Sequence, residues 1–81
     1  MHLESIKELY YEAMLRPIPS FLLREIKYEL EEHADPELMC SYYLYALRET
    51  ACAPRPSWKY TQAIIARLTR EQVPMESLPL W

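Results

Sequence analysis

The chain of 81 residues has no glycine and only one phenylalanine. Without glycine, no residue enters left-handed backbone conformations at low cost, which disfavours tight hairpins of the Asn-Gly kind. The same absence excludes the glycine-rich loops that cradle phosphates. No stretch alternates apolar and polar residues for long, and none approaches the roughly 18 apolar residues of a membrane span. Seven prolines are present instead, and helices separated by proline-containing connections are the natural alternative.

The chain is also poor in residues that mark a disulfide framework, a metal site or a catalytic centre. Cys40 and Cys52 are expected on one helix, where twelve residues separate them by roughly 18 Å. A disulfide needs Cα atoms within about 7 Å, so an intrachain bridge is excluded. With His2 and His33 they form no metal-ligand spacing, and no nucleophile is paired with a base. We expect no metal, no cofactor and no enzyme activity, and a reducing cytoplasm as the location.

The charge is unevenly distributed along the chain, although the net charge is only −3. Residues 1–47 hold four Lys or Arg and nine Asp or Glu, whereas residues 48–81 hold five and three. The first part therefore carries −5 and the second +2. A nucleic-acid contact, if present, belongs to the second part, although +2 is far from a dedicated basic patch.

Hydrophobic periodicity and helix-ending prolines predict one all-α domain over residues 1–81, and the 51% of hydrophobic residues suffices for a folded core. The expected architecture is a compact bundle of four helices plus a short fifth C-terminal helical turn. The predicted helices run from Ser5 to about Leu15, from Ser20 to about His33, from Pro36 to near Cys52 and from Ser57 to about Glu71, with the short turn over Met75 to Leu78.

Polar residues at the expected helix starts indicate how each helix is capped. Ser5 with Glu8 makes a capping box for the first helix, and Ser20 is a candidate cap for the second. Asp35 is a favoured N-cap, followed by a proline suited to the first helical position. Ser57 is expected to cap the fourth helix.

The fourth helix holds the pattern most informative about function. Tyr60, Ile64 and Leu68 recur every fourth residue, so they lie along one side of the helix. They fit the core of the bundle, since aliphatic residues at this spacing usually point inward. They also fit a binding helix in which Tyr60 or, better, Trp58 in the first turn stacks on nucleic-acid bases. The sequence leaves both interpretations open.

Lys59, Ala63 and Arg70 fall on roughly the opposite side of the helix from that stripe. Lys59, Arg67 and Arg70 form a cationic face together with Arg55 and with Arg48 as a further candidate. Such a face is either solvated or contacts phosphates without sequence choice.

Two further features suggest a protein partner. Glu29, Glu31 and Glu32 crowd the last turns of the second helix, as a solvated face or as a docking surface for a basic partner. Seven tyrosines are many for this length, and tyrosine is enriched at interfaces. Tyr43 and Tyr45 are the outer candidates for a partner or self-association surface on the third helix.

The order of these segments resembles the DnaD-type domain of replication proteins from Gram-positive bacteria and their phages, which the DnaB-type primosomal protein of those bacteria shares. The resemblance covers nearly the whole chain. It rests on Leu9-Tyr10-Tyr11-Glu12, Pro17-Ile18-Pro19-Ser20, Asp35-Pro36-Glu37-Leu38 and, most strongly, Trp58-Lys59-Tyr60-Thr61-Gln62-Ala63-Ile64-Ile65.

The last of these segments is similar to the family's Tyr-x-x-x-Ile-x-x-x-Trp signature. Tyr60 and Ile64 match it, and Leu68 stands where the family usually has tryptophan. The resemblance implies an all-α domain that binds DNA, assembles the primosome and brings the replicative helicase or its loader to DNA, with no catalytic residue and no cofactor. In the family, the signature helix and a basic stretch after it are linked to DNA binding.

Two functions are therefore expected. The first is a non-catalytic replication adaptor with weak, sequence-independent binding of single- or double-stranded DNA and a helicase or loader as protein partner. The second is a protein-interaction or oligomerisation module of the same fold without DNA binding, favoured by the missing tryptophan and the acidic first half. The family's winged-helix domain and basic tail are absent, so we expect a domain excised from a longer chain or a minimal phage version.

Overall fold

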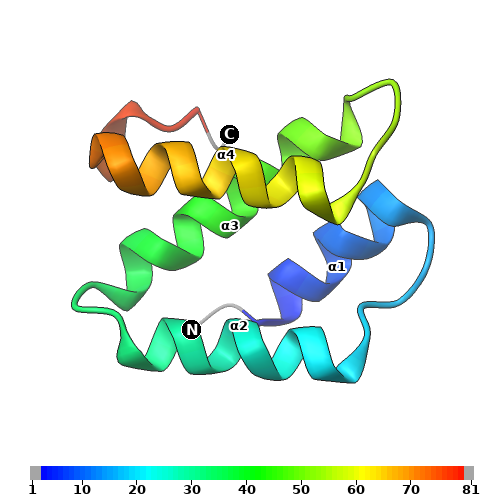
Figure 1. Ribbon diagram of the computed structural model, residues 1–81, viewed down its shortest axis with the longest axis horizontal. Helices are drawn as coiled ribbons and strands as arrows, with labels where there is room; N and C mark the ends of the chain where they lie inside the picture. Colours follow the sequence, from blue (N-terminus) through cyan, green and yellow to red (C-terminus); the bar gives the residue numbers. More distant parts are fainter. Residues whose placement is uncertain (1–2, 80–81) are drawn as a thin grey trace.

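The computed structural model describes residues 3–79 of the chain. Its elements are α1 (Leu3–Met14), α2 (Ser20–Glu32), α3 (Pro36–Ala51), α4 (Trp58–Glu71) and a short 3₁₀ helix, η1 (Met75–Ser77) (Figure 1). No strand occurs in this range. The predicted all-α bundle with a short fifth helical turn is therefore confirmed. No helix within residues 3–79 is both long enough and apolar enough to cross a bilayer.

Two of the predicted helix starts are confirmed in atomic detail. The Asp35 carboxylate accepts a hydrogen bond from the backbone N–H of Leu38 at 3.1 Å, directly before the proline that opens α3. The Ser57 hydroxyl accepts one from the backbone N–H of Tyr60, also at 3.1 Å, at the start of α4. Each cap satisfies one of the backbone donors that a helix start leaves unpaired.

The other two predicted caps are wrong. Because α1 already begins at Leu3, Ser5 lies within the helix and makes no capping box with Glu8. At α2 the cap position belongs to Pro19, whose extended backbone (φ −61°, ψ 143°) precedes the helix without a side-chain hydrogen bond. Ser20 is the first helical residue instead. The proline carbonyl still accepts from the next turn, so a polar cap is not required there.

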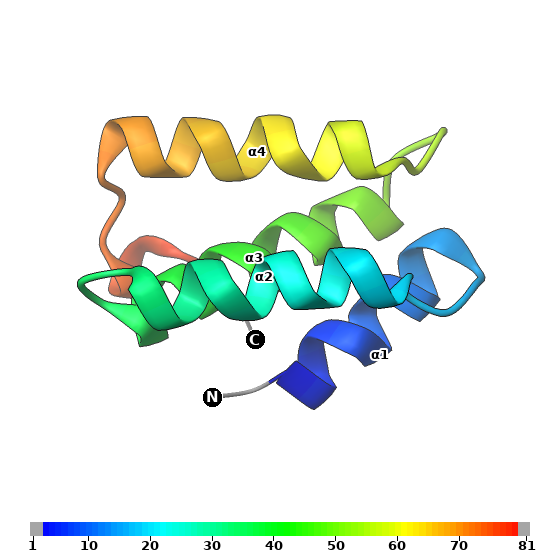
Figure 2. The same ribbon diagram turned by 60° about the horizontal axis from the view of Figure 1, so that its bottom comes forward.

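The bundle is organised around α3. This helix packs against α1, α2 and α4, and six consecutive residues from Met39 to Leu44 are buried. A helix buried on all sides is typical of the middle of a domain. Figure 1 shows α3 crossing between α2 and α4, and Figure 2 shows α1 and α4 on opposite sides of it. The core gathers around α3 and includes Ile6, Tyr10, Leu22, Ile26, Leu30, Met39, Tyr42, Ala46, Leu47, Ile65 and Leu68.

Polar contacts within this core fix α4 and the segment that follows it. The hydroxyls of Thr50 in α3 and Thr61 in α4 are both fully buried and lie 2.6 Å apart. Each hydroxyl also lies within hydrogen-bonding distance of the backbone carbonyl four residues earlier. The two hydroxyl protons are therefore shared among three oxygen–oxygen contacts. Beyond α4, the Tyr42 hydroxyl donates to the carbonyl of Val73 at 2.6 Å. These contacts set the position of α4 against α3, because an unpaired buried hydroxyl is unfavourable.

The lack of glycine has a structural consequence at two helix ends. Leu15 after α1 (φ 59°) and Gln72 after α4 (φ 51°, ψ 46°) adopt the left-handed conformation that ends many helices. A residue with a Cβ atom is disfavoured there by about 1–2 kcal/mol. Both side chains are exposed, Leu15 to 80%, so packing does not explain their presence.

We therefore expect Leu15→Gly and Gln72→Gly each to raise the free energy of unfolding by about 0.5–1 kcal/mol, because glycine relieves the strain but adds unfolded-state entropy. Urea denaturation measures the change. Ala66→Gly is the matched control, since glycine within α4 should lower stability by about 1 kcal/mol. A loss of stability in all three variants would contradict the role of the backbone angle.

Candidate functional site

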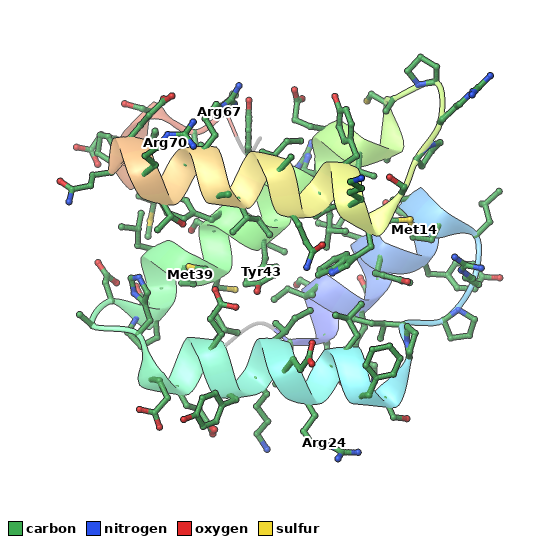
Figure 3. The ribbon with its side chains drawn as sticks, in the orientation of Figure 1. Met14, Arg24, Met39, Tyr43, Arg67 and Arg70 are labelled. Atoms are coloured by element: carbon green, nitrogen blue, oxygen red, sulfur yellow. The ribbon has the colours of Figure 1, made fainter. Side chains whose placement is uncertain are left out.

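The outer side of α4 presents the cationic face that the sequence predicts. Thr61, Ile65 and Leu68 are buried against the bundle, while Lys59, Arg67 and Arg70 are exposed on the remaining surface. Figure 3 shows Arg67 on the side of α4 that points away from α2, whereas Arg70 lines the groove between the two helices. At about 100° per residue, these cations and the exposed alanines Ala63 and Ala66 share one face, which we call the α4 cationic face.

No carboxylate within residues 3–79 forms an ion pair with these three cations or with Arg55, which is exposed in the loop before α4. An ion pair elsewhere among these residues joins Lys7 to Glu4 at 3.4 Å in α1. Arg48, at the end of α3, is exposed but has an interaction of its own, so it does not count toward the α4 cationic face.

Trp58 is not placed as a stacking platform, contrary to the prediction. Its indole is half-buried and packs on two tyrosines of the bundle. The Tyr43 ring is stacked on it at a centroid distance of 6.3 Å and 14° between planes, and the Tyr10 ring is tilted at 5.8 Å and 49°. Its Nε1 atom is buried without a hydrogen-bond partner among the described residues. Aromatic packing on neighbouring helices therefore keeps this ring from a nucleic-acid base.

Of the two interpretations left open for Tyr60, core packing is wrong, since 45% of its surface is exposed. Of the three residues in the predicted stripe, Leu68 is buried and Ile64 is half-buried against the core. The helix is rotated so that Thr61 and Ile65 take the innermost positions with Leu68. Tyr60 is consequently the aromatic side chain of α4 that remains accessible to a ligand.

The predicted partner surface on α3 is wrong for Tyr43. Tyr43 is only 4% exposed, and its hydroxyl donates to Glu29 Oε2 at 2.7 Å. Burial raises the pKa of Tyr43, and the hydrogen bond and negative charge of Glu29, with that of Glu25, raise it further. Tyr45 is half-buried against the core. Because α3 is enclosed by three helices, its tyrosines are core residues with polar ends.

The glutamates predicted for a partner are exposed: Glu31 and Glu32 both face solvent on α2. The sequence interpretation missed their aromatic neighbours Phe21 and Tyr28, which are exposed to 63% and 66%. The sequence did contain a signal for their exposure. The two aromatic residues lie seven positions apart, hence on one side of the helix, and outside the buried stripe of Leu22, Ile26 and Leu30.

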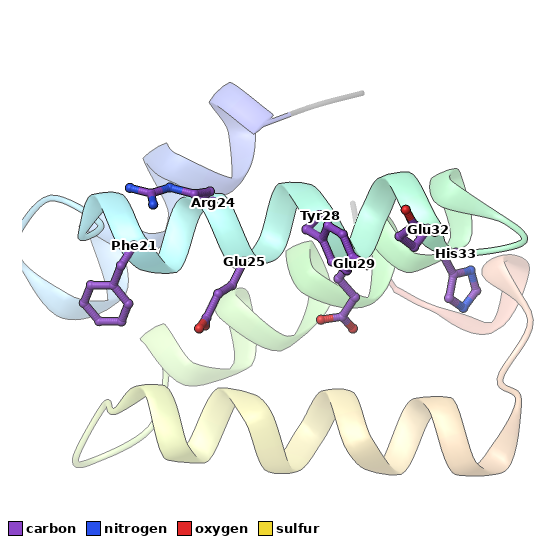
Figure 4. A pocket seen from close by; sticks show the side chains of 7 residues that line it. All are labelled: Phe21, Arg24, Glu25, Tyr28, Glu29, Glu32 and His33. Carbon is purple, nitrogen blue, oxygen red and sulfur yellow. The ribbon is translucent and has the colours of Figure 1, made fainter.

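A groove of about 500 Å³ separates α2 from α4. Its apolar lining comes from Leu22, Ile26, Tyr43, Trp58, Ile65 and Ala66, and Arg70 borders it on α4. Next to it, a shallow hollow of about 810 Å³ follows α2 and shares two glutamates with the groove (Figure 4). Its lining residues are Phe21, Arg24, Glu25, Tyr28, Glu29, Glu32 and His33. The molecule thus carries an acidic, aromatic surface on α2 and a cationic one on α4.

Both thiols are free, as expected from the distance between them along one helix. Cys40 is buried and Cys52 is exposed. Within residues 3–79, no group of three or more His, Cys, Asp or Glu side chains is arranged to hold a metal ion. His2 lies outside the described residues. Comparisons of the chain with protein-family models, with curated proteins and with solved structures find no match.

The buried tyrosines should make stability sensitive to alkaline pH. Burial also raises the pKa of Tyr42, and Asp35 adds to that shift. Above about pH 10 the unfolded chain loses tyrosine protons that the folded chain retains, so the free energy of unfolding falls as pH rises. Tyr43→Phe should lower stability at neutral pH by about 0.5–1.5 kcal/mol, since the contact with Glu29 is lost.

The same substitution should make the fall above about pH 10 shallower, because one retained proton is removed. Urea denaturation at neutral pH and at about pH 10.5 measures both effects. An unchanged difference between the two pH values would show that Tyr43 does not hold its proton more tightly in the folded chain.

Proposed function

We propose that this chain is a non-catalytic adaptor domain of DNA replication that contacts DNA weakly through the α4 cationic face. The observation that carries the proposal is the exposure of Lys59, Arg67 and Arg70 on one side of a helix, without a described carboxylate to neutralise them. Their side chains, like that of Arg55, are available to phosphates. The resemblance of the α4 sequence to the DnaD-type signature supports the same assignment.

The separation of charge makes DNA contact reasonable for an acidic chain. The glutamates of the hollow lie on α2, whereas the cations lie on α4, where Arg67 points away from α2 (Figure 3) and Arg70 borders the groove that Glu25 and Glu29 also line. At an ionic strength of about 0.15 M, charges more than about 8 Å apart are largely screened. A phosphate that binds α4 more than about 8 Å from the α2 glutamates would therefore respond mainly to the local cations.

The contact should be weak and insensitive to sequence. Three or four phosphate contacts give a slope of log affinity against log salt of about −2 to −3 for a single strand. The dissociation constant should lie near about 10⁻⁴ M at physiological salt, at the weak end of non-specific binding. An adaptor that acts within a larger assembly can use such an affinity, since linked sites reinforce one another.

A protein-interaction module without DNA binding is the second candidate. It is favoured by the enclosure of Trp58 between tyrosines, which removes one stacking residue, and by the exposed aromatic rings on α2. A helicase or helicase loader is the partner that the sequence resemblance implies for either function.

The cations can be tested by charge reversal. Lys59→Glu, Arg67→Glu and Arg70→Glu combined should abolish binding of a fluorescent single strand in a low-salt anisotropy titration, because phosphates would then meet carboxylates. The matched control reverses Arg16, Arg24 and Lys27, which are exposed outside α4. It makes the same change in net charge and should retain most of the affinity. Equal losses in both triple variants would reject a localised DNA face.

Tyr60 gives a second test that separates single strands from duplexes. Tyr60→Ala should weaken single-strand binding by about 1–2 kcal/mol, because one base loses its stacking partner, and should affect duplex binding much less. Trp58→Phe should leave both affinities unchanged, since its ring already packs on Tyr10 and Tyr43. The reverse ranking of the two variants would show that α4 meets DNA differently.

A further inference from the structure

The exposed side of α2 has the composition of a contact surface. Phe21 and Tyr28 are each about two-thirds exposed and lie on one side of the helix with Glu25 and Glu32. With Glu29, these residues form what we call the α2 aromatic-acidic face. Figure 4 shows Phe21 and Glu25 on the same edge of the helix. Two large rings seven residues apart are more than scattered surface hydrophobics, which occur singly.

The charges around these rings restrict the partner. Three glutamates and only one cation, Arg24, line the hollow along α2. The α2 helix of a second copy is therefore an unsuitable partner, because carboxylates would face carboxylates. A fitting surface must be positively charged and must have, opposite each ring, either a small residue or a guanidinium that attracts the ring.

The α4 cationic face meets both requirements. It consists of Lys59, Ala63, Ala66, Arg67 and Arg70, all exposed. These positions have the spacing i, i+4, i+7, i+8 and i+11. The α2 aromatic-acidic face has the same spacing from Phe21 to Glu32. We propose that the α4 cationic face of one copy binds the α2 aromatic-acidic face of another copy.

The antiparallel register explains how the residue types match. With the two helices laid side by side in opposite directions, Glu32 falls opposite Lys59 and Tyr28 opposite Ala63. One turn further on, Glu25 falls beside Arg67. Phe21 falls opposite Arg70, where a guanidinium and an aromatic ring attract each other. Opposite charges thus meet on both sides of a ring that lies over an alanine.

The contact joins two different surfaces, so each copy in a pair leaves one surface of each kind free. Such a heterologous contact adds copies one after another unless the rotation closes a ring. One helix pair is a small interface, so we expect a dissociation constant between about 10 µM and 1 mM. The inference goes beyond the proposed function and does not depend on it, because no DNA takes part.

Sedimentation equilibrium of the whole chain over about 10 µM to 1 mM, without DNA, tests the contact. At about 50 mM salt the average mass should rise above that of a monomer, and about 500 mM salt should reverse the rise, since screening weakens exposed ion pairs. Glu25→Lys with Glu32→Lys should weaken association at least tenfold, and so should Lys59→Glu with Arg67→Glu.

The decisive sample is an equimolar mixture of those two double variants. Each alone places like charges at the contact, whereas the mixture pairs the lysines introduced on α2 with the glutamates introduced on α4. Association should therefore return in the mixture. Phe21→Ser with Tyr28→Ser is a variant of unchanged net charge that should also weaken association.

Two matched controls change net charge elsewhere, Glu8→Lys with Glu12→Lys on α1 and Arg16→Glu with Lys27→Glu. All four residues are exposed, and both variants should associate like the parent. A monomer at about 1 mM in low salt would overturn the proposal and leave the α2 aromatic-acidic face for a different basic partner. Association that survives both charge reversals, or that fails to return in the mixture, would overturn it equally.

Discussion

Burial of α3 on all sides is the constraint on which the rest of the structure depends. Because α1, α2 and α4 each cover part of this helix, each of them needs only one apolar stripe and keeps its other side for solvent or a partner. The Thr50–Thr61 contact and the Tyr42 hydroxyl then hold α4 and the following segment in place. The surfaces that α4 and α2 expose are the sides of these two helices that do not pack against the core.

The two proposed contacts share one of the two oppositely charged surfaces. DNA and a second copy would both use the α4 cationic face, so binding of one would exclude the other. A weakly self-associating adaptor would then release its copies as it engages a polyanion. Neither contact requires α3 to move, since Lys59, Arg67 and the α2 rings all lie outside the core.

Much of the fold follows from local signals, whereas the candidate site follows only in part. Helix order, the Asp35 and Ser57 caps and the end of α3 could be predicted, because prolines, capping residues and apolar spacing act within one or two turns. The exposure of Lys59 and Arg70 also followed from their position opposite the predicted stripe, and that of Arg67 from its charge. The environments of Tyr43, Trp58 and Tyr60 did not, because an amphipathic aromatic residue suits a core and a surface equally well.

The sequence by itself determined that the chain forms four helices and a short helical turn within residues 3–79, where proline separates them, and that the cations gather on α4. Only the tertiary structure decided which aromatic rings are available. Trp58 is enclosed because α1 and α3 bring Tyr10 and Tyr43 against it, and Phe21 and Tyr28 remain exposed because no helix covers that side of α2. The physical reason is that helix periodicity gives a side chain's direction about its own axis, whereas the neighbours it meets depend on how the helices pack.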